Sequence, residues 1–154
     1  MIAQYEGEGR ESALDAPRVY AAGQNHKHLP EMTKVAGLDA PPIFTPVVAD
    51  YYSGMLVTVP LHRAQVSGTL ADMCEVYRRR YLGPVVKFVE GFEPDGFMAA
   101  SALSGRDDME IAVFGNDERM LLAARFDNLG KGASGAAMQC MNVALGLPEQ
   151  TGLM

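Results

Sequence analysis

Short apolar runs alternate with turn-forming residues along the chain, and this pattern predicts several β-strands. Runs that are rich in β-branched and aromatic residues and bounded by glycine or proline are typical of strands. Such runs occupy residues 18–23, 43–49, 55–61 and 85–89, with a less clear one at 97–103. Two more, 109–114 and 120–126, flank Gly115-Asn116-Asp117-Glu118, which predicts a β-hairpin with a four- or five-residue loop.

Helical periodicity is clearest between Thr69 and Leu82. Thr69 is a good N-cap, and Asp72, three residues later, resembles the second half of a capping box. Apolar and aromatic side chains then recur at spacings of three and four residues along one face. They are Leu70, Met73, Cys74, Tyr77 and Tyr81. Shorter helices are predicted at 30–36, closed by Gly37, and at 136–145, closed by Gly146.

The order of these elements predicts the fold class. Strands joined by short turns, with the helices in separate segments, are typical of an α+β fold. We therefore expect an α+β domain with a mixed, mostly antiparallel sheet and helices on one face. At 154 residues the chain has the size of one domain and can bury a sizeable core.

Charge and composition narrow the functional class. The net charge of −6 argues against a nucleic-acid partner. No apolar run approaches the length that spans a membrane, and the acidic first residues do not resemble a signal peptide. Cys74 and Cys140 lie far apart in the sequence, which favours reduced thiols and a cytoplasmic location.

The candidate chemistry centres on Gln24-Asn25-His26-Lys27-His28-Leu29-Pro30-Glu31-Met32. If the chain is extended up to Lys27, His26 and His28 point to the same face, because strand side chains alternate. Pro30 then suits the first turn of a helix. Two nearby histidines are also common in a solvated turn, so both interpretations remain open. No metal site is predicted, because no third ligand stands at a suitable spacing.

Several other signals are absent or ambiguous. The chain has no glycine-rich dinucleotide fingerprint, no P-loop and no G-x-S-x-G motif. Cys74 and Cys140 both fall within predicted helices, where a small apolar packing role is the ordinary interpretation. The arginines at 78–80 are typical of a solvated helix end, with anion binding as the alternative.

A second candidate is the glycine-rich segment from Asp127 to Ala136. Its glycines could bring the backbone close to a ligand, and Asn128 and Lys131 precede a helix N-terminus, which favours anionic or polar groups. The alternative is a strand-to-helix loop whose glycines serve packing alone. The residue pattern by itself favours that alternative.

Four segments together resemble the carboxyl-terminal half of N-acetyl-gamma-glutamyl-phosphate reductase, in the shorter form of that family. They are QNHKHLPEM, IFTPVV, GMLVTVPLH and VFGNDERMLLAARFDNLGKGASGAAMQCMNVALGLPEQTGL. The resemblance covers nearly the whole chain from about Pro17. It implies a fold like that of the carboxyl-terminal domain of semialdehyde and glyceraldehyde-phosphate dehydrogenases. It also implies NADPH-dependent reduction of N-acetyl-gamma-glutamyl phosphate to the semialdehyde in arginine biosynthesis.

The resemblance carries residue roles with it. His28 resembles the family's catalytic histidine, the general base and acid that pairs with a cysteine nucleophile, and His26 takes a substrate-binding place. Asn128 resembles the asparagine that faces the nicotinamide, and Lys131 and Gly132 shape that NADP-facing loop. Two turns depart from the family's pattern, Ser53-Gly54 and Ser104-Gly105-Arg106-Asp107.

The resemblance also implies a domain plan. Residues 1–127 are expected to form the catalytic and dimerisation domain. Residues 128–154 are expected to form a closing helix and tail that pack on an amino-terminal NADP-binding domain, and that domain would also carry the cysteine. The expected partners are an acyl-phosphate substrate and further copies of the protein in a dimer or tetramer. The alternative is a catalytically inert binding or dimerisation domain of the same group.

Overall fold

The computed structural model describes residues 2–153, which separate into two compact units. The first unit ends at Tyr51 and the second begins at Tyr52. Each unit is described by itself. Within the described residues, no helix is long and apolar enough to cross a membrane.

The first unit is built from short elements. They are α1 (Ile2–Tyr5), a 3₁₀ turn (Ser12–Asp15), β1 (Arg18–Val19), α2 (Leu29–Ala36) and β2 (Val47–Val48). β1 and β2 pair antiparallel, with Arg18 opposite Val48. The Arg10 guanidinium donates to Asp15 at 2.6 Å and to Asp50 at 2.7 Å, and so ties the two ends of the unit together.

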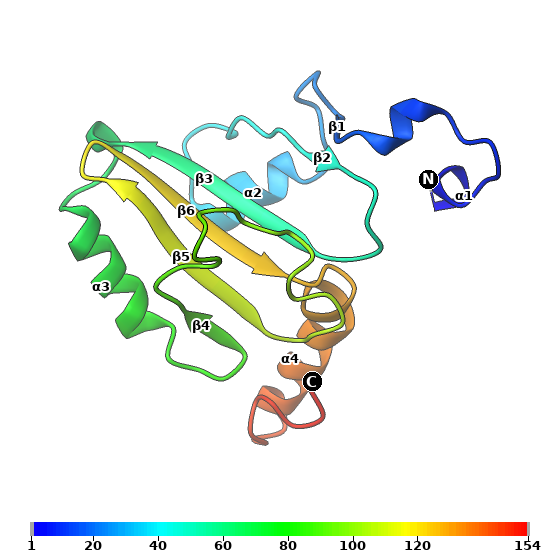
Figure 1. The fold of residues 1–154 in the computed structure, drawn as a ribbon. Helices are drawn as coiled ribbons and strands as arrows, with labels where there is room; N and C mark the ends of the chain where they lie inside the picture. The colour runs from blue at the N-terminus through cyan, green and yellow to red at the C-terminus, as the bar shows by residue number, and fades with distance from the viewer. Residues whose placement is uncertain (1, 154) are drawn as a thin grey trace. The chain divides into compact units, whose positions relative to one another are not determined.

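The second unit is a four-stranded sheet with two longer helices (Figure 1). Its elements are β3 (Met55–His62), a 3₁₀ turn (Arg63–Gln65), α3 (Leu70–Arg80), β4 (Val86–Phe88), β5 (Met109–Asn116), β6 (Arg119–Phe126), a π-helical turn (Gly130–Ser134) and α4 (Gly135–Ala144). The strand order is β3-β6-β5-β4. Only the β4–β5 pair is parallel, so the sheet is mixed and mostly antiparallel, as the sequence predicts.

The β5–β6 hairpin forms the middle of this sheet. Ala112 and Ala123 face each other across it and are almost completely buried. The turn contains only Asp117 and Glu118, because strand pairing continues to Asn116 opposite Arg119. The prediction of a hairpin is therefore confirmed, while the predicted four- or five-residue loop is too long. The Asn116 side chain shortens the loop by accepting hydrogen bonds from the backbone N–H groups of both Glu118 and Arg119.

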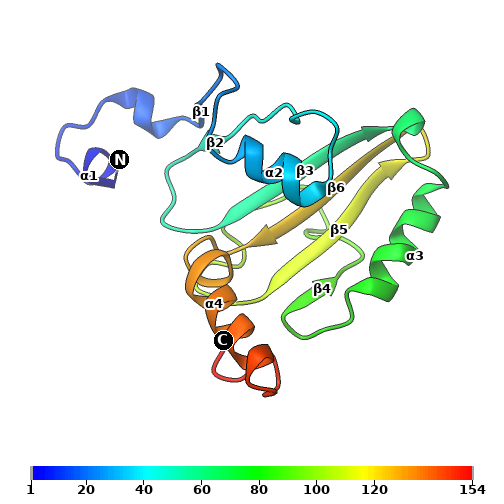
Figure 2. The ribbon, with the colours of Figure 1, turned by 180° about the vertical axis from the view of Figure 1, so that it is seen from behind.

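Helix α3 packs along β5 and β4, and both views show it on that side of the sheet (Figures 1 and 2). The predicted capping box is present, because Thr69 and Asp72 each accept a hydrogen bond from the other's backbone N–H. Tyr77 and Tyr81, one turn apart, stack with their ring centroids 5.7 Å apart. Periodicity and capping chemistry thus identified this helix within about two residues at each end.

Three strand predictions are wrong in whole or in part. Residues 18–23 form a strand only at β1, because Ala21 adopts a left-handed φ of 52° that an extended chain cannot continue through. Residues 43–49 pair only at β2, which directly follows Pro46, a residue without an N–H to donate. Residues 97–103 form no strand. The chain there folds into successive turns, and one of them buries Leu103.

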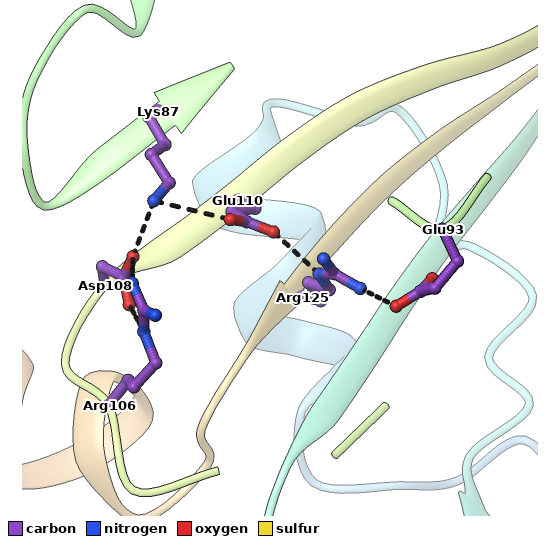
Figure 3. Close-up of polar contacts among 6 residues, drawn as sticks. All are labelled: Lys87, Glu93, Arg106, Asp108, Glu110 and Arg125. Atoms are coloured by element: carbon purple, nitrogen blue, oxygen red, sulfur yellow. Dashed lines mark hydrogen bonds and ion pairs between the residues drawn. The ribbon is translucent and has the colours of Figure 1, made fainter. Parts of the chain in front are cut away.

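A row of alternating charges crosses β4, β5 and β6 on one face of the sheet (Figure 3). Lys87, Glu110 and Arg125 lie in register on the three strands. Lys87 contacts Asp108 at 3.0 Å and Glu110 at 3.4 Å, and Arg125 donates to Glu110 at 2.8 Å. Arg106 extends the row at one end by pairing with Asp108, and Glu93 extends it at the other by pairing with Arg125. Six charges of alternating sign therefore neutralise one another across the strands.

Candidate functional site

The histidine stretch connects β1 to α2 in the first unit, and it is not a strand. Ala21 and Gln24 both have positive φ, and His28 has helical dihedrals at the start of α2. The predicted extended segment through Lys27 is therefore wrong. The two imidazoles nevertheless lie together, with ring centroids 4.8 Å apart, because the turn brings the backbone N–H of His28 to within 3.3 Å of His26 Nδ1.

Two aromatic rings surround His26. Tyr20 meets its imidazole edge-on at 5.8 Å between centroids, and Phe44 does so at 5.1 Å. The Gln24 carboxamide holds the Phe44 backbone at both of its polar atoms, donating to the carbonyl at 2.8 Å and accepting from the N–H at 2.9 Å. His26 is consequently half-buried, whereas His28 is exposed to solvent.

Helix α2 begins where the sequence predicts. Pro30 lies in its first turn, Leu29 is buried, and Gly37 ends it with a left-handed φ of 63°. An open hollow of about 720 Å³ lies between this helix and the histidine stretch. His26 and Lys34 contribute polar groups to its lining, and Leu29 and Leu38 contribute apolar surface.

The second candidate group lies in the second unit, in the connection from β6 to α4. Asn128 Oδ1 accepts a hydrogen bond from the Gly54 backbone N–H at 2.7 Å, which leaves its amide nitrogen as the group that can donate to a ligand. Gly132 donates its N–H to the Asp127 carbonyl at 2.8 Å, and Lys131 is half-exposed in the π-helical turn. The loop therefore has a defined backbone conformation.

Close packing explains one glycine of this loop. A Cβ on Gly130 would lie 2.5 Å from the carbonyl oxygen of Arg106, closer than any side chain can come. The turn at 104–107 thus presses directly against the start of the π-helical turn. At Gly130 the structure therefore shows the packing alternative, and the approach of this backbone to a ligand stays a prediction.

Asp127 organises this loop, although it was not among the predicted site residues. It is 2% exposed and accepts hydrogen bonds from Ser53 Oγ at 2.8 Å, Leu129 N at 2.6 Å, Gly130 N at 3.0 Å and the Gly105 backbone N–H. Burial alone raises the pKa of this carboxyl, but the donated hydrogen bonds outweigh it and lower the pKa to about 2. Asp127 is therefore a buried anion with its charge fully satisfied.

The two turns that depart from the reductase pattern meet at this carboxylate. Ser53 Oγ lies 2.5 Å from Ser104 Oγ, and both serines border a hollow of about 360 Å³ beside Asp127. One signal for Asp127 was present in the sequence. An aspartate just before a helix start commonly accepts backbone N–H groups two and three residues later, as it does here.

The predicted site residues therefore form two local groups. His26 and His28 contact each other in the first unit, and Asn128, Lys131 and Gly132 share one loop of the second unit. Their catalytic, substrate-binding and cofactor-binding roles stay predictions. The structure thus combines a histidine pair at the start of α2 with a mixed, mostly antiparallel sheet in the second unit.

The chain belongs to the family of the semialdehyde dehydrogenase dimerisation domain, which it matches over residues 5–128. It is 41% identical over 145 residues to N-acetyl-gamma-glutamyl-phosphate reductase 2 of Nostoc sp. (strain PCC 7120), covering 88% of this chain and 45% of that protein. It is also 41% identical over 154 residues to N-acetyl-gamma-glutamyl-phosphate reductase of Brucella anthropi, covering 95% of this chain and 50% of the relative. The chain thus spans about half the length of these relatives.

Proposed function

We propose that the chain is the catalytic and dimerisation part of an oxidoreductase that reduces N-acetyl-gamma-glutamyl phosphate to N-acetylglutamate semialdehyde with NADPH, in arginine biosynthesis. The observation that carries this proposal is the contact between His26 and His28 at the start of α2, in a chain about 40% identical to reductases of that name. The similarity to these reductases supports the further proposal that the protein is a biosynthetic enzyme of the cytoplasm.

The proposed reaction assigns His28 to proton transfer. A cysteine thiolate of the amino-terminal domain would attack the acyl carbon, and a thioester would form as phosphate leaves. NADPH, when bound, would supply the hydride that reduces the thioester to the aldehyde with release of the thiol. His28 takes the proton of the thiol in the first step and supplies a proton to the developing oxyanion in the second. The exposure of His28 supports this role, because the imidazole is open to groups from outside the unit.

The nucleophile is proposed to come from an amino-terminal domain. Cys74 is half-buried on α3, where burial and the nearby Glu90 raise the pKa of its thiol, the opposite of what an attacking thiolate needs. Cys140 lies on α4, outside both candidate groups. The chain alone is therefore proposed to be inactive.

NADP is proposed to bind mainly to the same amino-terminal domain, with Asn128, Lys131 and Gly132 on its nicotinamide side. The Asn128 amide fits this role, because its oxygen is held by Gly54 and its nitrogen remains to donate to the carboxamide of a nicotinamide ring. NADP supplies the hydride when bound. The residues of this chain orient the ring and exclude water from it.

Residues 128–154 are proposed to pack on that amino-terminal domain, with residues 1–127 as the catalytic and dimerisation part. Helix α4 and its tail support this, because Met141, Val143 and Leu145 are more than half exposed. The tail itself is anchored, since the buried Asn142 side chain donates to the carbonyls of Glu149 and Thr151. The apolar residues on α4 are therefore presented on an ordered scaffold.

Reconstitution tests the proposed function. The chain is mixed with the amino-terminal half of the Brucella anthropi relative, and NADPH oxidation is followed with N-acetyl-gamma-glutamyl phosphate. We expect turnover that falls about 10²-fold or more in His28→Ala. Turnover should persist in His62→Ala, which alters the last residue of β3. Formation of a complex without turnover would contradict the proposal and favour the alternative, a catalytically inert dimerisation domain.

A further inference from the structure

We propose that Gln24 is a positioning residue that fixes His26 in its Nε2–H tautomer, so that His26 presents a hydrogen-bond donor to an anionic oxygen of the substrate. The inference deepens the proposed function and rests on it for the identity of the ligand. The tautomer itself follows from contacts within the first unit.

The tautomer is set by the hydrogen bond between the two histidines. The backbone N–H of His28 donates to Nδ1 of His26 at 3.3 Å. A ring nitrogen that accepts a hydrogen bond carries no proton, and a neutral imidazole has its single proton on the other nitrogen. Nε2 of His26 therefore carries the proton and can only donate.

This tautomer persists only if the ring cannot turn away from the His28 N–H. Tyr20 and Phe44 limit that rotation, because their rings lie edge-on to the imidazole at 5.8 Å and 5.1 Å. Tyr20 directly follows β1, whereas Phe44 lies 18 residues beyond His26, in a stretch that forms no strand. Phe44 therefore needs a separate restraint.

Gln24 supplies that restraint. Its side-chain nitrogen donates to the Phe44 carbonyl at 2.8 Å and its side-chain oxygen accepts from the Phe44 N–H at 2.9 Å. Of the side chains of this length, only a glutamine carboxamide can donate and accept at once. The two bonds span 20 residues of sequence and close the loop that carries α2.

The backbone at Gln24 supports a specific role for the side chain. Its φ of 55° lies in the left-handed region, which a residue with a long side chain seldom occupies. Glycine would adopt this φ without strain, but the glycine of this turn is Gly23, one position earlier. Strain of this kind persists where the surrounding contacts compensate for it, and the double hydrogen bond to Phe44 is that contact.

The consequence for recognition is a fixed donor beside the open hollow at α2. Acyl phosphates and carboxylates both offer anionic oxygens that accept from an imidazole N–H. An imidazole in the opposite tautomer would present a lone pair to such an oxygen and repel it. Gln24 therefore acts on substrate affinity through His26, while His28 keeps its own proton-transfer role.

Imidazole NMR tests the inference on the chain as it stands. Long-range ¹H–¹⁵N correlation spectra of ¹⁵N-labelled protein at about pH 8.5, where histidine side chains are ordinarily neutral, distinguish protonated from unprotonated ring nitrogens. We expect His26 to show an unprotonated Nδ1 and a protonated Nε2. A wild-type spectrum with the proton on Nδ1 overturns the inference without any variant.

Gln24→Asn separates the double hydrogen bond from the backbone strain. Asparagine adopts a left-handed φ more readily than glutamine, so the turn is retained, but its carboxamide is one methylene too short to reach Phe44. We expect the two nitrogen shifts of His26 to move towards each other as the tautomers average. Gln65→Asn is the matched control, because Gln65 bonds to the backbone of His62 at 2.8 Å, and should leave His26 unchanged.

A second variant and a kinetic measurement complete the test. Gln24→Glu keeps the length and one of the two bonds, so an intermediate shift is expected. Unchanged His26 signals in both Gln24 variants would overturn the inference.

In the reconstituted enzyme, Gln24→Asn should raise KM for the acyl phosphate about tenfold with little change in kcat. Absence of turnover in the wild type would count against the proposed function alone, because the tautomer is measured without it.

Discussion

Asp127 is the residue on which the local structure of the second unit depends most visibly. Its carboxylate accepts hydrogen bonds from Ser53, Gly105, Leu129 and Gly130, which belong to three separate segments of the chain. The loop of Asn128, Lys131 and Gly132 is therefore held in part by a buried charge. Its position should respond to the protonation of that charge.

The lowered pKa of Asp127 gives a pH prediction. The pKa of this carboxyl is about 2 in the folded chain, below its ordinary value of 3.8. Its contribution to the free energy of unfolding is therefore present above about pH 4 and is lost as the pH falls towards 2. As the pH falls towards 2, we expect the free energy of unfolding to lose about 2 kcal/mol from this group. Urea titrations of the wild type and Asp127→Asn at several pH values measure the difference.

Asp127→Asn should lack this part of the acid dependence and should be less stable than the wild type at neutral pH. The exposed Asp39 provides the control, since Asp39→Asn should keep the wild-type profile. An equal loss of stability between pH 4 and pH 2 in all three proteins would show that Asp127 does not carry the effect.

Single residues were predictable where a motif is local. The histidine pair and Asn128 were singled out because each stands in a short segment that resembles a known family, and their roles stay predictions. Asp127 stands in the same segment, but its role depends on donors at Ser53 and Gly105, far away in the sequence. Pattern alone could not show that these turns meet at one carboxylate.

The charge row on the sheet is the main polar feature at the scale of elements (Figure 3). Arg125 is the most buried cation of this row. It pairs with Glu110 and Glu93, and its guanidinium carbon lies 4.3 Å from the centroid of the Phe92 ring. Its side chain is 9% exposed. Removing one partner of a buried ion pair destabilises the fold strongly, because the remaining charge stays desolvated without a counter-charge.

We therefore expect Arg125→Met to lower the free energy of unfolding by roughly 3–5 kcal/mol, by leaving Glu110 and Glu93 without their shared partner. Arg79→Met is the matched control. Arg79 pairs with Glu75 at 2.6 Å, but its side chain is 78% exposed, so the loss should stay below about 1 kcal/mol. Chemical denaturation measures the free energy of unfolding of both variants. Equal decreases would refute the idea that burial determines how much these ion pairs contribute to stability.

Elements with a strong local signal were predicted well, and those without one were not. α3 has a capping box and a regular apolar face, and the β5–β6 hairpin has two long β-rich runs. The wrong predictions fall on residues 18–23, 43–49 and 97–103, where apolar composition is real but turns with positive φ, prolines or hydrogen-bonded turns interrupt the extended chain. In such segments an apolar composition predicts that side chains are buried more reliably than it predicts a β-strand.

The edge strand β3 has an apolar surface that we expect a partner to cover. β3 is an edge strand, and Met55, Val57 and Val59 are each 40% or more exposed on one face of it. An exposed edge strand with apolar side chains promotes association unless it is covered. Together with membership of a dimerisation-domain family, this favours a second copy of the chain as the partner.

We expect sedimentation equilibrium to show a dimer or tetramer of the wild-type chain. Val59→Lys should shift the protein towards the monomer, because a charge in the covered face would be desolvated without a partner. Val76→Lys, on the 62% exposed Val76 of α3, should leave the association unchanged. A monomeric wild type at micromolar concentration would contradict the proposed dimerisation role.

We propose that His28 of this chain pairs with a thiol from an amino-terminal domain. The rate at which iodoacetamide alkylates that thiol in the reconstituted protein, followed against pH, measures the pairing directly. With wild-type chain we expect fast alkylation down to about pH 6, because an adjacent imidazolium stabilises the thiolate. With His28→Gln the profile should move to that of an ordinary thiol, near pH 8.5, while His62→Gln keeps the wild-type profile. Superimposable profiles for wild type and His28→Gln would contradict the account.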